Sequence, residues 1–299
     1  MGTVVSIANM KGGVGKTTLC VNLAFQMLCS SKKVLVVDND PQFNATTALL
    51  SPDLYVSGFL ANDASYSTIY EVYEKPPRIA GASKRPSTRD HFITRWWLTD
   101  NQEITLDLLA SRIELYETLR NPSQKEYLLD KFLKKHANAY DYVFIDCPPT
   151  PSVLTLSAFA ASDFVLIPVV PDYFSTLGLA QFLGTLVNFK SDLHDSHDVT
   201  PLGLIFTRRP RASNPETHKS ISRVKQALDQ TRGDIDVPIF ETSMSHFKVY
   251  EKALWQSVPV QKISGRGTRG KSDCLVELSK LGREFQLKVA DAAVKKEAS

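Results

Sequence analysis

The sequence predicts an α/β fold in which a doubly wound, mostly parallel sheet carries helices on both faces. Short apolar segments alternate with longer helical stretches along nearly all of the 299 residues. Several of the short segments are apolar at every position, which is typical of parallel strands buried on both sides. A glycine-rich turn joins the first of them to the first helical stretch. These observations favour a single domain that spans residues 1–299.

The individual strands and helices follow from the same alternation. The predicted strands are residues 4–8, 33–38, 104–109, 141–146, 164–169, 201–207 and 237–240. The predicted helices lie near residues 16–30, 122–138, 152–161, 174–190, 214–231, 246–255 and 272–292. Four apolar residues recur at helical spacing in the last helix and are expected to pack in the core, namely Leu275, Leu278, Leu281 and Phe285.

Residues 75–101 interrupt the alternation. Prolines, small residues and scattered charges occur here, as in Lys75-Pro76-Pro77-Arg78. Because proline and small residues disfavour regular elements, we expect an atypical inserted loop within the domain. The adjacent Trp96 and Trp97 are expected to pack against the protein rather than to stack on bases.

The composition fits a cytoplasmic protein with a sizeable core. Of the residues, 43% are hydrophobic and 22% are charged. No apolar stretch is long enough to cross a bilayer, and the N-terminus lacks the basic segment that begins a signal peptide. The four cysteines form no C-x-x-C pair, so no zinc or redox site is indicated.

Residues 9–18 follow the first predicted strand and read N-M-K-G-G-V-G-K-T-T. Glycines allow backbone N–H groups to curl around phosphate oxygens, and the N-terminus of the following helix adds partial positive charge. A lysine at position 16 would reach the β- and γ-phosphates, and the hydroxyl of Thr17 would bind Mg²⁺. The order of strand, loop and helix therefore predicts a phosphate-binding loop.

A second motif, V-V-D-N-D-P-Q-F-N-A-T at residues 36–46, follows the second predicted strand. Ligands gather at the carboxyl ends of strands in such folds, and alternate strand residues share a face. Asp38 and Asp40 could therefore both face the phosphate loop and position water or the water shell of a metal ion. A capped turn before a helix is the alternative, since Asp-Pro and Asn favour turns.

A third motif, Y-V-F-I-D-C-P-P at residues 142–149, is a hydrophobic strand that ends in Asp146. An aspartate at this place helps to hold Mg²⁺ in many nucleotide-binding proteins. Such an aspartate alone is often only a helix cap, but here it completes a set of three motifs.

The three motifs together resemble those of ParA-type partition ATPases, in the ParA/MinD family of deviant P-loop ATPases. Lys11 stands at the front of the loop and Met10 occupies a position where the ordinary motif has glycine. Residues 168–179, 238–242 and 259–260 resemble later parts of the same family. The resemblance covers nearly the whole chain and implies the fold of P-loop NTPases.

The resemblance also implies roles for individual residues. ATP would be bound by the loop residues Lys11, Gly12, Gly13, Val14, Gly15, Lys16, Thr17 and Thr18. In this family the lysine matching Lys16 binds phosphates within its own subunit, and the one matching Lys11 reaches the nucleotide of a dimer partner. The matching of Thr17 and Asp146 implies that they hold Mg²⁺ directly and through water. Asp40 matches the acid that positions the attacking water, and Asp38 is a supporting acid; the division between these two stays open.

Lysines and arginines gather in the last third of the chain, and residues 208–225 contain six of them against one acid. Such a cluster favours binding to nucleic-acid phosphates without regard to sequence, although a solvated basic surface is the plainer alternative. Arg211 lies where the family often carries a DNA-contacting arginine. Lys219, Arg223 and Lys248 are further candidates, chosen by charge and neighbourhood.

The resemblance implies a nucleotide-driven switch. ATP would join two subunits in a sandwich homodimer that binds DNA non-specifically and is cytoplasmic and nucleoid-associated. A ParB-like or other adaptor would stimulate slow, Mg²⁺-dependent hydrolysis. The switch would partition or position a plasmid, a chromosome or a large assembly such as a carboxysome.

Three alternatives belong to other classes. A MinD-like membrane ATPase would need a C-terminal amphipathic helix with bulky apolar residues, and residues 290–299 are small and charged, so no stable membrane binding is expected. An iron protein like that of nitrogenase would need a second cysteine to pair with Cys147 in holding a cluster, and none is evident. A scaffold without hydrolysis would not need the intact set of lysines and aspartates.

Overall fold

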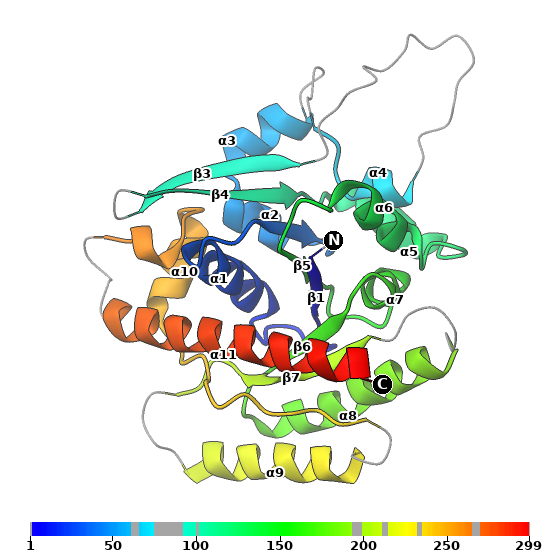
Figure 1. The fold of residues 1–299 in the computed structure, drawn as a ribbon, viewed down its shortest axis with the longest axis vertical. Helices are drawn as coiled ribbons and strands as arrows, with labels where there is room; N and C mark the ends of the chain where they lie inside the picture. The colour runs from blue at the N-terminus through cyan, green and yellow to red at the C-terminus, as the bar shows by residue number, and fades with distance from the viewer. Residues whose placement is uncertain are drawn as a thin grey trace.

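The computed structural model describes residues 2–60, 66–74, 92–99, 102–192, 199–210, 215–231, 235–264 and 270–298. Within these residues the centre of the fold is a seven-stranded sheet of order β3-β4-β2-β5-β1-β6-β7, with helices on both faces (Figure 1). Every neighbouring pair is parallel except β3 with β4. The predicted fold class is confirmed.

Apart from β3, the strands follow the predicted apolar segments closely. They are β1 (Thr3–Ile7), β2 (Val34–Asp38), β3 (Ile93–Thr99), β4 (Gln102–Leu109), β5 (Tyr142–Asp146), β6 (Phe164–Val169) and β7 (Thr200–Phe206). Every residue of β2 and of β6 is buried, as expected for strands covered on both faces. Since β1, β2 and β5 are adjacent, the three sequence motifs leave the sheet side by side at its carboxyl edge.

Two groups of helices enclose the sheet. One hydrophobic cluster joins the sheet to α1 (Lys16–Cys29), α2 (Asn44–Leu49), α3 (Pro52–Tyr55), α10 (Lys248–Trp255) and α11 (Lys271–Ala298). The other joins it to α4 (Tyr70–Tyr73), α5 (Tyr116–Arg120), α6 (Leu128–His136), α7 (Val153–Ala160), α8 (Tyr173–Asp192) and α9 (Pro215–Thr231). In α11, Leu278, Leu281 and Phe285 are buried and Leu275 is partly buried against the cluster, which confirms the predicted packing.

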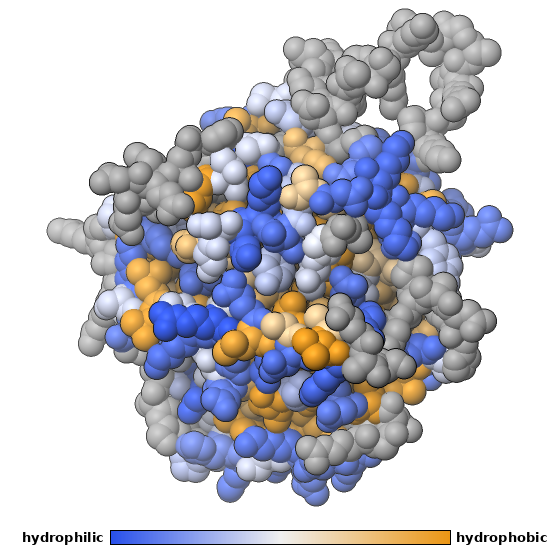
Figure 2. All heavy atoms as spheres, viewed as in Figure 1, coloured by the Kyte–Doolittle hydropathy of each residue, from blue (hydrophilic) through white to orange (hydrophobic). Residues whose placement is uncertain are grey.

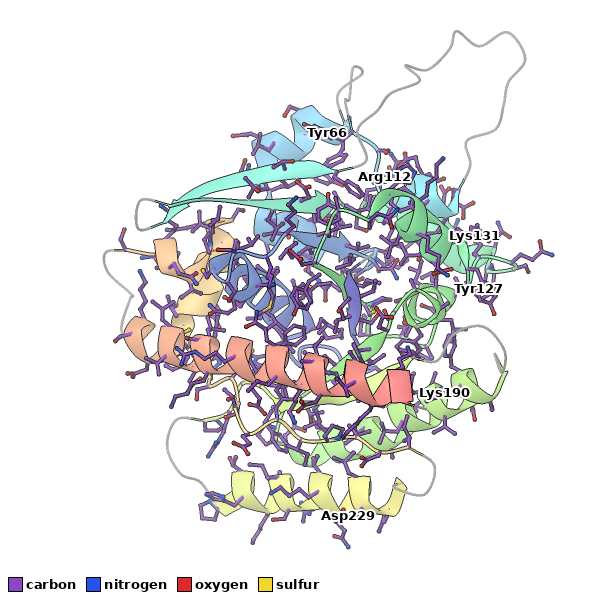
Figure 3. The ribbon with its side chains drawn as sticks, in the orientation of Figure 1. Tyr66, Arg112, Tyr127, Lys131, Lys190 and Asp229 are labelled. Carbon is purple, nitrogen blue, oxygen red and sulfur yellow. The ribbon has the colours of Figure 1, made fainter. Side chains whose placement is uncertain are left out.

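The segment after β4 is tied to α4 by charged and aromatic side chains. Arg112, labelled in Figure 3, has its guanidinium 4.4 Å from the ring centre of Tyr70 and 3.4 Å from the carboxylate of Glu71. These contacts fix the loop that leaves the sheet beside β2. Among the described residues, none of the helices combines the length and the apolar character that a membrane span requires.

The loop prediction for residues 75–101 is wrong for its last part. Residues 93–99 form β3, which pairs antiparallel with β4 at the edge of the sheet. The pairing partner lies only a few residues ahead in the chain, so an edge hairpin forms despite the irregular composition. Residues 75–91 and 100–101, and the side chains of Trp96 and Trp97, lie outside the described part of the structure.

The predicted strand at residues 237–240 is also wrong as a member of the sheet. This segment runs beside β7 and forms an isolated parallel bridge between Leu204 and Ile239. Pro238 has no N–H to donate, which limits regular strand pairing. Its carbonyl instead accepts a hydrogen bond from the N–H of Leu204 at 2.8 Å. The short helices α2 to α5 were not predicted, because each is too brief to show a helical period.

Gly203 allows the close approach of β7 and residues 238–240. Its φ is +149°, and a Cβ placed on it would lie 2.6 Å from the carbonyl oxygen of Pro238 and 2.9 Å from the ring of Phe240. In the pairing of β6 with β7, Val165 lies opposite Pro201 and the next residue, Leu166, lies opposite Gly203. Strand β7 therefore has one extra residue at this point. Only glycine fits this position without moving backbone.

We therefore expect Gly203→Ala to lower the free energy of unfolding by about 1–3 kcal/mol, through overpacking and backbone strain. Gly184→Ala on α8 is the matched control, because nothing lies within 4 Å of a Cβ placed there. That control is expected to be neutral or to stabilise by about 0.5–1 kcal/mol. Urea denaturation followed by circular dichroism measures both, and equal stability of the two variants would contradict this account.

Candidate active site

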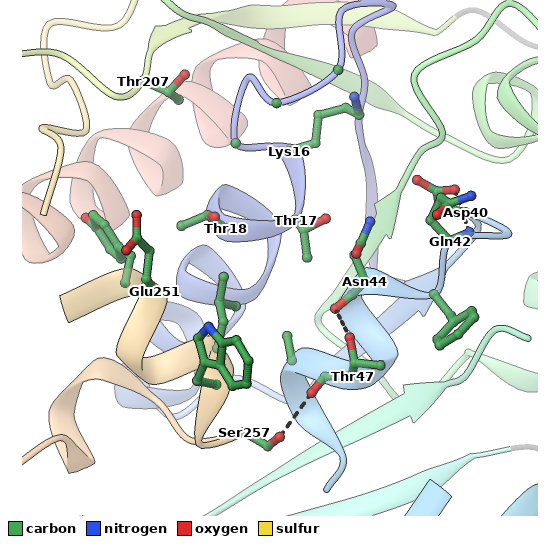
Figure 4. A pocket seen from close by; sticks show the side chains of 18 of the residues that line it. Lys16, Thr17, Thr18, Asp40, Gln42, Asn44, Thr47, Thr207, Glu251 and Ser257 are labelled. Atoms are coloured by element: carbon green, nitrogen blue, oxygen red, sulfur yellow. Dashed lines mark hydrogen bonds between the residues drawn. The ribbon is translucent and has the colours of Figure 1, made fainter. Parts of the chain in front are cut away.

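A cavity of about 820 Å³ opens at the carboxyl edge of the sheet. Its lining includes the loop before α1, Asp40 after β2, Thr207 after β7, and parts of α2 and α10. Figure 4 shows Lys16, Thr17 and Thr18 at one end and a groove between α2 and α10 at the other. There the hydroxyl of Ser257, which follows α10, donates to the carbonyl of Thr47 on α2 at 3.0 Å.

The loop at residues 11–15 has the shape that phosphate binding requires. Gly13 and Gly15 have φ values of +74° and +86°, which residues with a side chain rarely adopt. Gly15 leads directly into α1, so the helix N-terminus points at the cavity. The ammonium of Lys16 donates to the backbone carbonyls of Asn9 at 3.1 Å and Lys11 at 3.2 Å, and so lies along the loop.

Two residues that follow β7 donate hydrogen bonds to backbone carbonyls of this loop. The hydroxyl of Thr207 donates to the carbonyl of Val14 at 2.6 Å, and a guanidinium N–H of Arg208 donates to the carbonyl of Gly13 at 2.9 Å. Sequence reasoning missed the role of Thr207 and counted Arg208 only among basic surface residues. The position of Thr207 at the carboxyl end of a strand was the available signal.

The carboxylate of Asp146 is buried beside Thr17. The hydroxyl of Thr17 donates to Asp146 Oδ2 at 2.6 Å, whereas the buried Oδ1 has no hydrogen-bond partner among the described residues. Burial and the charge of Asp38 raise the pKa of Asp146, while Thr17 and Lys16 act to lower it. A buried carboxylate oxygen without a partner suits Mg²⁺ or one of its waters, so this pair fits a magnesium site.

Asp38 and Asp40 differ in what they contact. Asp38 is fully buried, and its carboxylate accepts hydrogen bonds from the N–H and the hydroxyl of Thr46, each at 2.7 Å. Burial raises the pKa of Asp38 to about 7. Asp40 lines the cavity, and its carboxylate accepts from the N–H of Gln42 at 2.9 Å. The expectation that both carboxylates face the loop is therefore met only by Asp40.

Lys11 does not line the cavity of its own chain. Its ammonium binds both carboxylate oxygens of Asp172, at 2.8 and 2.7 Å, and the hydroxyl of Ser175 at 3.1 Å. Although partial burial acts to raise it, the hydrogen bonds from Lys11 and Ser175 lower the pKa of Asp172. The two loop lysines thus have opposite environments, since Lys16 is buried and Lys11 is half-exposed.

The predicted DNA-contacting residues that the structure describes do not form one cluster. Lys219 and Arg223 are exposed one turn apart on α9, and Figure 2 shows hydrophilic side chains along the outer side of this helix. Lys248 is exposed on α10, which Figure 1 draws on the other side of α11 from α9. Arg211 lies outside the described residues. The structure therefore separates Lys248 from the α9 pair.

Comparison with known proteins places these features in a family. A family model described as an AAA domain matches residues 2–199. The chromosome partitioning protein ParA of Myxococcus xanthus is 32% identical over 241 residues, which are 81% of this chain and 74% of the relative. The sporulation initiation inhibitor protein Soj of Bacillus subtilis is 29% identical over 292 residues, which are 97% of each chain. These relatives favour a partition protein over the MinD-like alternative.

Solved structures agree on the fold. An ATP complex of a variant of Cyanothece McdA has a TM-score of 0.69 and 23% identity, and the match covers 97% of this chain and 96% of that one. The structure of pNOB8 ParA bound to nonspecific DNA has a TM-score of 0.71 and 17% identity, and the match covers 97% and 99%. The chain belongs to the ParA-type partition ATPases.

Proposed function

We propose that this chain is a switch in which Mg²⁺-dependent ATP binding joins two copies, the ATP-bound dimer binds DNA without sequence preference, and slow hydrolysis releases it. The observation that carries the proposal is the phosphate loop with two lysines, one lying along the loop and one held outside the cavity. The ATP complex of the McdA variant and the DNA complex of pNOB8 ParA support the two ligands.

The loop would hold the triphosphate through backbone N–H groups, the α1 N-terminus and Lys16. Its carbonyls at Gly13 and Val14 are already occupied by Arg208 and Thr207, so the loop is held in shape before ligand arrives. Thr17 and Asp146 would hold Mg²⁺. When bound, this ion would offset the negative charge of the phosphates. Burial lowers the pKa of Lys16, and the neighbouring Asp146 acts to raise it.

Asp40 would orient the attacking water, and Asp38 would fix the start of α2. Only Asp40 lines the cavity, and its second carboxylate oxygen is not needed to accept from Gln42. Asp38 Oδ2 accepts from Thr46, and Oδ1 accepts from the N–H of Asp40 at 3.3 Å. The hydroxyl of Thr46 in turn accepts from the N–H of Ser111 at 2.8 Å. This network ties α2 to the ends of β2 and β4.

Lys11 would leave Asp172 and reach the nucleotide of the second copy. The side chains of Lys11 and Asp172 are 29% and 40% exposed, and exposed ion pairs contribute only about 0.2–1 kcal/mol. A γ-phosphate carries more charge than one carboxylate and would compete well for the ammonium. Asp172 therefore holds Lys11 within its own chain until a nucleotide-bearing partner arrives, and breaking this ion pair then costs little free energy.

Non-specific DNA binding would place the dimer on the nucleoid, with the exposed basic residues of α9 as contacts. A ParB-like or other adaptor would stimulate hydrolysis and release the dimer, as the family resemblance implies. The cargo would be a plasmid, a chromosome or a large assembly such as a carboxysome. The repeated cycle of binding and release would partition or position that cargo.

We expect Asp40→Ala to slow ATP hydrolysis by about 100-fold or more while ATP still binds, because water positioning is lost. Asp38→Ala should lower the free energy of unfolding by about 1–3 kcal/mol, because two buried donors of Thr46 lose their acceptor. Phosphate release and urea denaturation measure the two effects. Near-normal turnover by Asp40→Ala would overturn its assignment.

Lys11→Ala should bind ATP nearly as tightly as the unmodified protein but fail to dimerise with it. Lys16→Ala should instead lose about 10- to 100-fold in ATP affinity, because charge-assisted hydrogen bonds to phosphate are lost. Fluorescent-nucleotide titration and light scattering separate affinity from assembly. An ATP-dependent dimer of Lys11→Ala would contradict the role proposed for this lysine.

The double variant Lys219→Glu and Arg223→Glu should weaken binding to two unrelated duplexes equally and reduce the slope of affinity against salt by about 2. Lys131→Glu with Lys135→Glu on α6 is the matched control, with the same charge change on an exposed helix distant from α9 (Figure 3). Fluorescence polarisation measures both. Equal loss in the control would show that net charge, and not the α9 surface, matters.

A further inference from the structure

Residues 244–247 form a wall of the cavity beyond the phosphate loop. Met244, Ser245, His246 and Phe247 all line the cavity, which continues to them from Thr18 and the end of β7. If the loop takes the phosphates, the rest of the nucleotide occupies the remainder of this cavity, of which residues 244–247 form one wall. The position of residues 244–247 therefore affects how well the nucleoside fits.

The backbone of this wall is joined to the continuation of β7. The N–H of Met244 donates to the carbonyl of Phe206 at 2.8 Å, and the N–H of His246 donates to the carbonyl of Arg209 at 2.9 Å. Residues 207 and 208 between them hold the phosphate loop. Residues 206–209 therefore contact both the wall and the phosphate loop: their backbone binds the wall, and the side chains of Thr207 and Arg208 bind the loop.

A carboxylate of α11 holds the wall from outside the cavity. Glu277 accepts two hydrogen bonds from Ser245, one from its N–H at 2.8 Å and one from its hydroxyl at 2.6 Å. Each carboxylate oxygen takes one of them, and Ser245 is only 9% exposed. Glu277 itself does not line the cavity.

A second carboxylate of α11 makes the same kind of contact away from the cavity. Glu284 accepts from the N–H groups of Glu241 and Thr242, at 2.7 and 2.8 Å. Neither of these two residues lines the cavity. The helix therefore carries two chemically similar carboxylate contacts, and only that of Glu277 reaches a residue of the wall.

We infer that Glu277 is a positioning residue that sets the nucleoside-facing wall of the ATP site by fixing Ser245. The inference rests on the proposed ATP binding and concerns its nucleoside end alone. Removal of the carboxylate frees two donors of Ser245, so residues 244–247 sample more positions and must be ordered again when nucleotide binds. The phosphate loop would keep its own hydrogen bonds from Thr207 and Arg208 in such a variant.

Calorimetric titration of Glu277→Ala tests this, with ATP and with inorganic tripolyphosphate as probes, each with Mg²⁺. We expect ATP affinity to fall about 10-fold, on the scale of one or two lost hydrogen bonds, and tripolyphosphate affinity to stay unchanged. Glu277→Gln, whose amide oxygen accepts from the Ser245 N–H and whose NH₂ donates to its hydroxyl, should recover most of the ATP affinity. If the alanine variant does not fold, Glu277→Asp carries the test, because its shorter side chain cannot reach both donors of Ser245. It should lose ATP affinity and keep tripolyphosphate affinity.

Glu284→Ala is the matched control and should leave both affinities unchanged while lowering the melting temperature to a similar extent. Unchanged ATP affinity in Glu277→Ala would overturn the inference. An equal loss for ATP and tripolyphosphate, or an equal loss of ATP affinity in Glu284→Ala, would overturn it as well, since each indicates general loosening. If the unmodified protein does not bind ATP, the proposed function fails and this inference with it.

Discussion

The shape of the phosphate loop before ligand arrives is the constraint on which the rest of the site depends. Backbone N–H groups serve phosphate only when the neighbouring carbonyls are turned away and satisfied. Here Thr207 and Arg208 occupy the carbonyls of Val14 and Gly13, and Lys16 binds two more from within the loop. A loop held in this way has little conformational entropy left to lose when it binds its ligand.

The sheet makes this shape of the phosphate loop possible, because it brings distant parts of the chain together at one edge. The strands β1, β2 and β5 lie next to one another, and each carries one of the three motifs beyond its carboxyl end. Their burial on both faces fixes the register, so the acids that follow them cannot shift independently. The carboxylates of Asp38 and Asp146 are consequently both buried, and the charges of Asp38 and Lys16 act in opposite directions on the pKa of Asp146.

The sequence predicts the central strands and all three motifs, because local patterns of apolar residues and glycine specify them. It does not predict the contact of Arg208 with Gly13, which joins residues 195 positions apart. The engagement of Asp38 by Thr46 and of Lys11 by Asp172 escaped prediction for a related reason, since strand alternation indicates a face but not the partner found there. The strand β3 was missed because its pairing with β4 outweighs an irregular composition.

Calorimetric titration of ATP with Mg²⁺ into the unmodified protein, set beside adenosine, tests the preformed loop most directly. A site built around backbone N–H groups and Lys16 predicts one bound ATP per chain and no detectable binding of adenosine, because the phosphates make the decisive contacts. No uptake of ATP, or adenosine bound as tightly as ATP, would contradict the account.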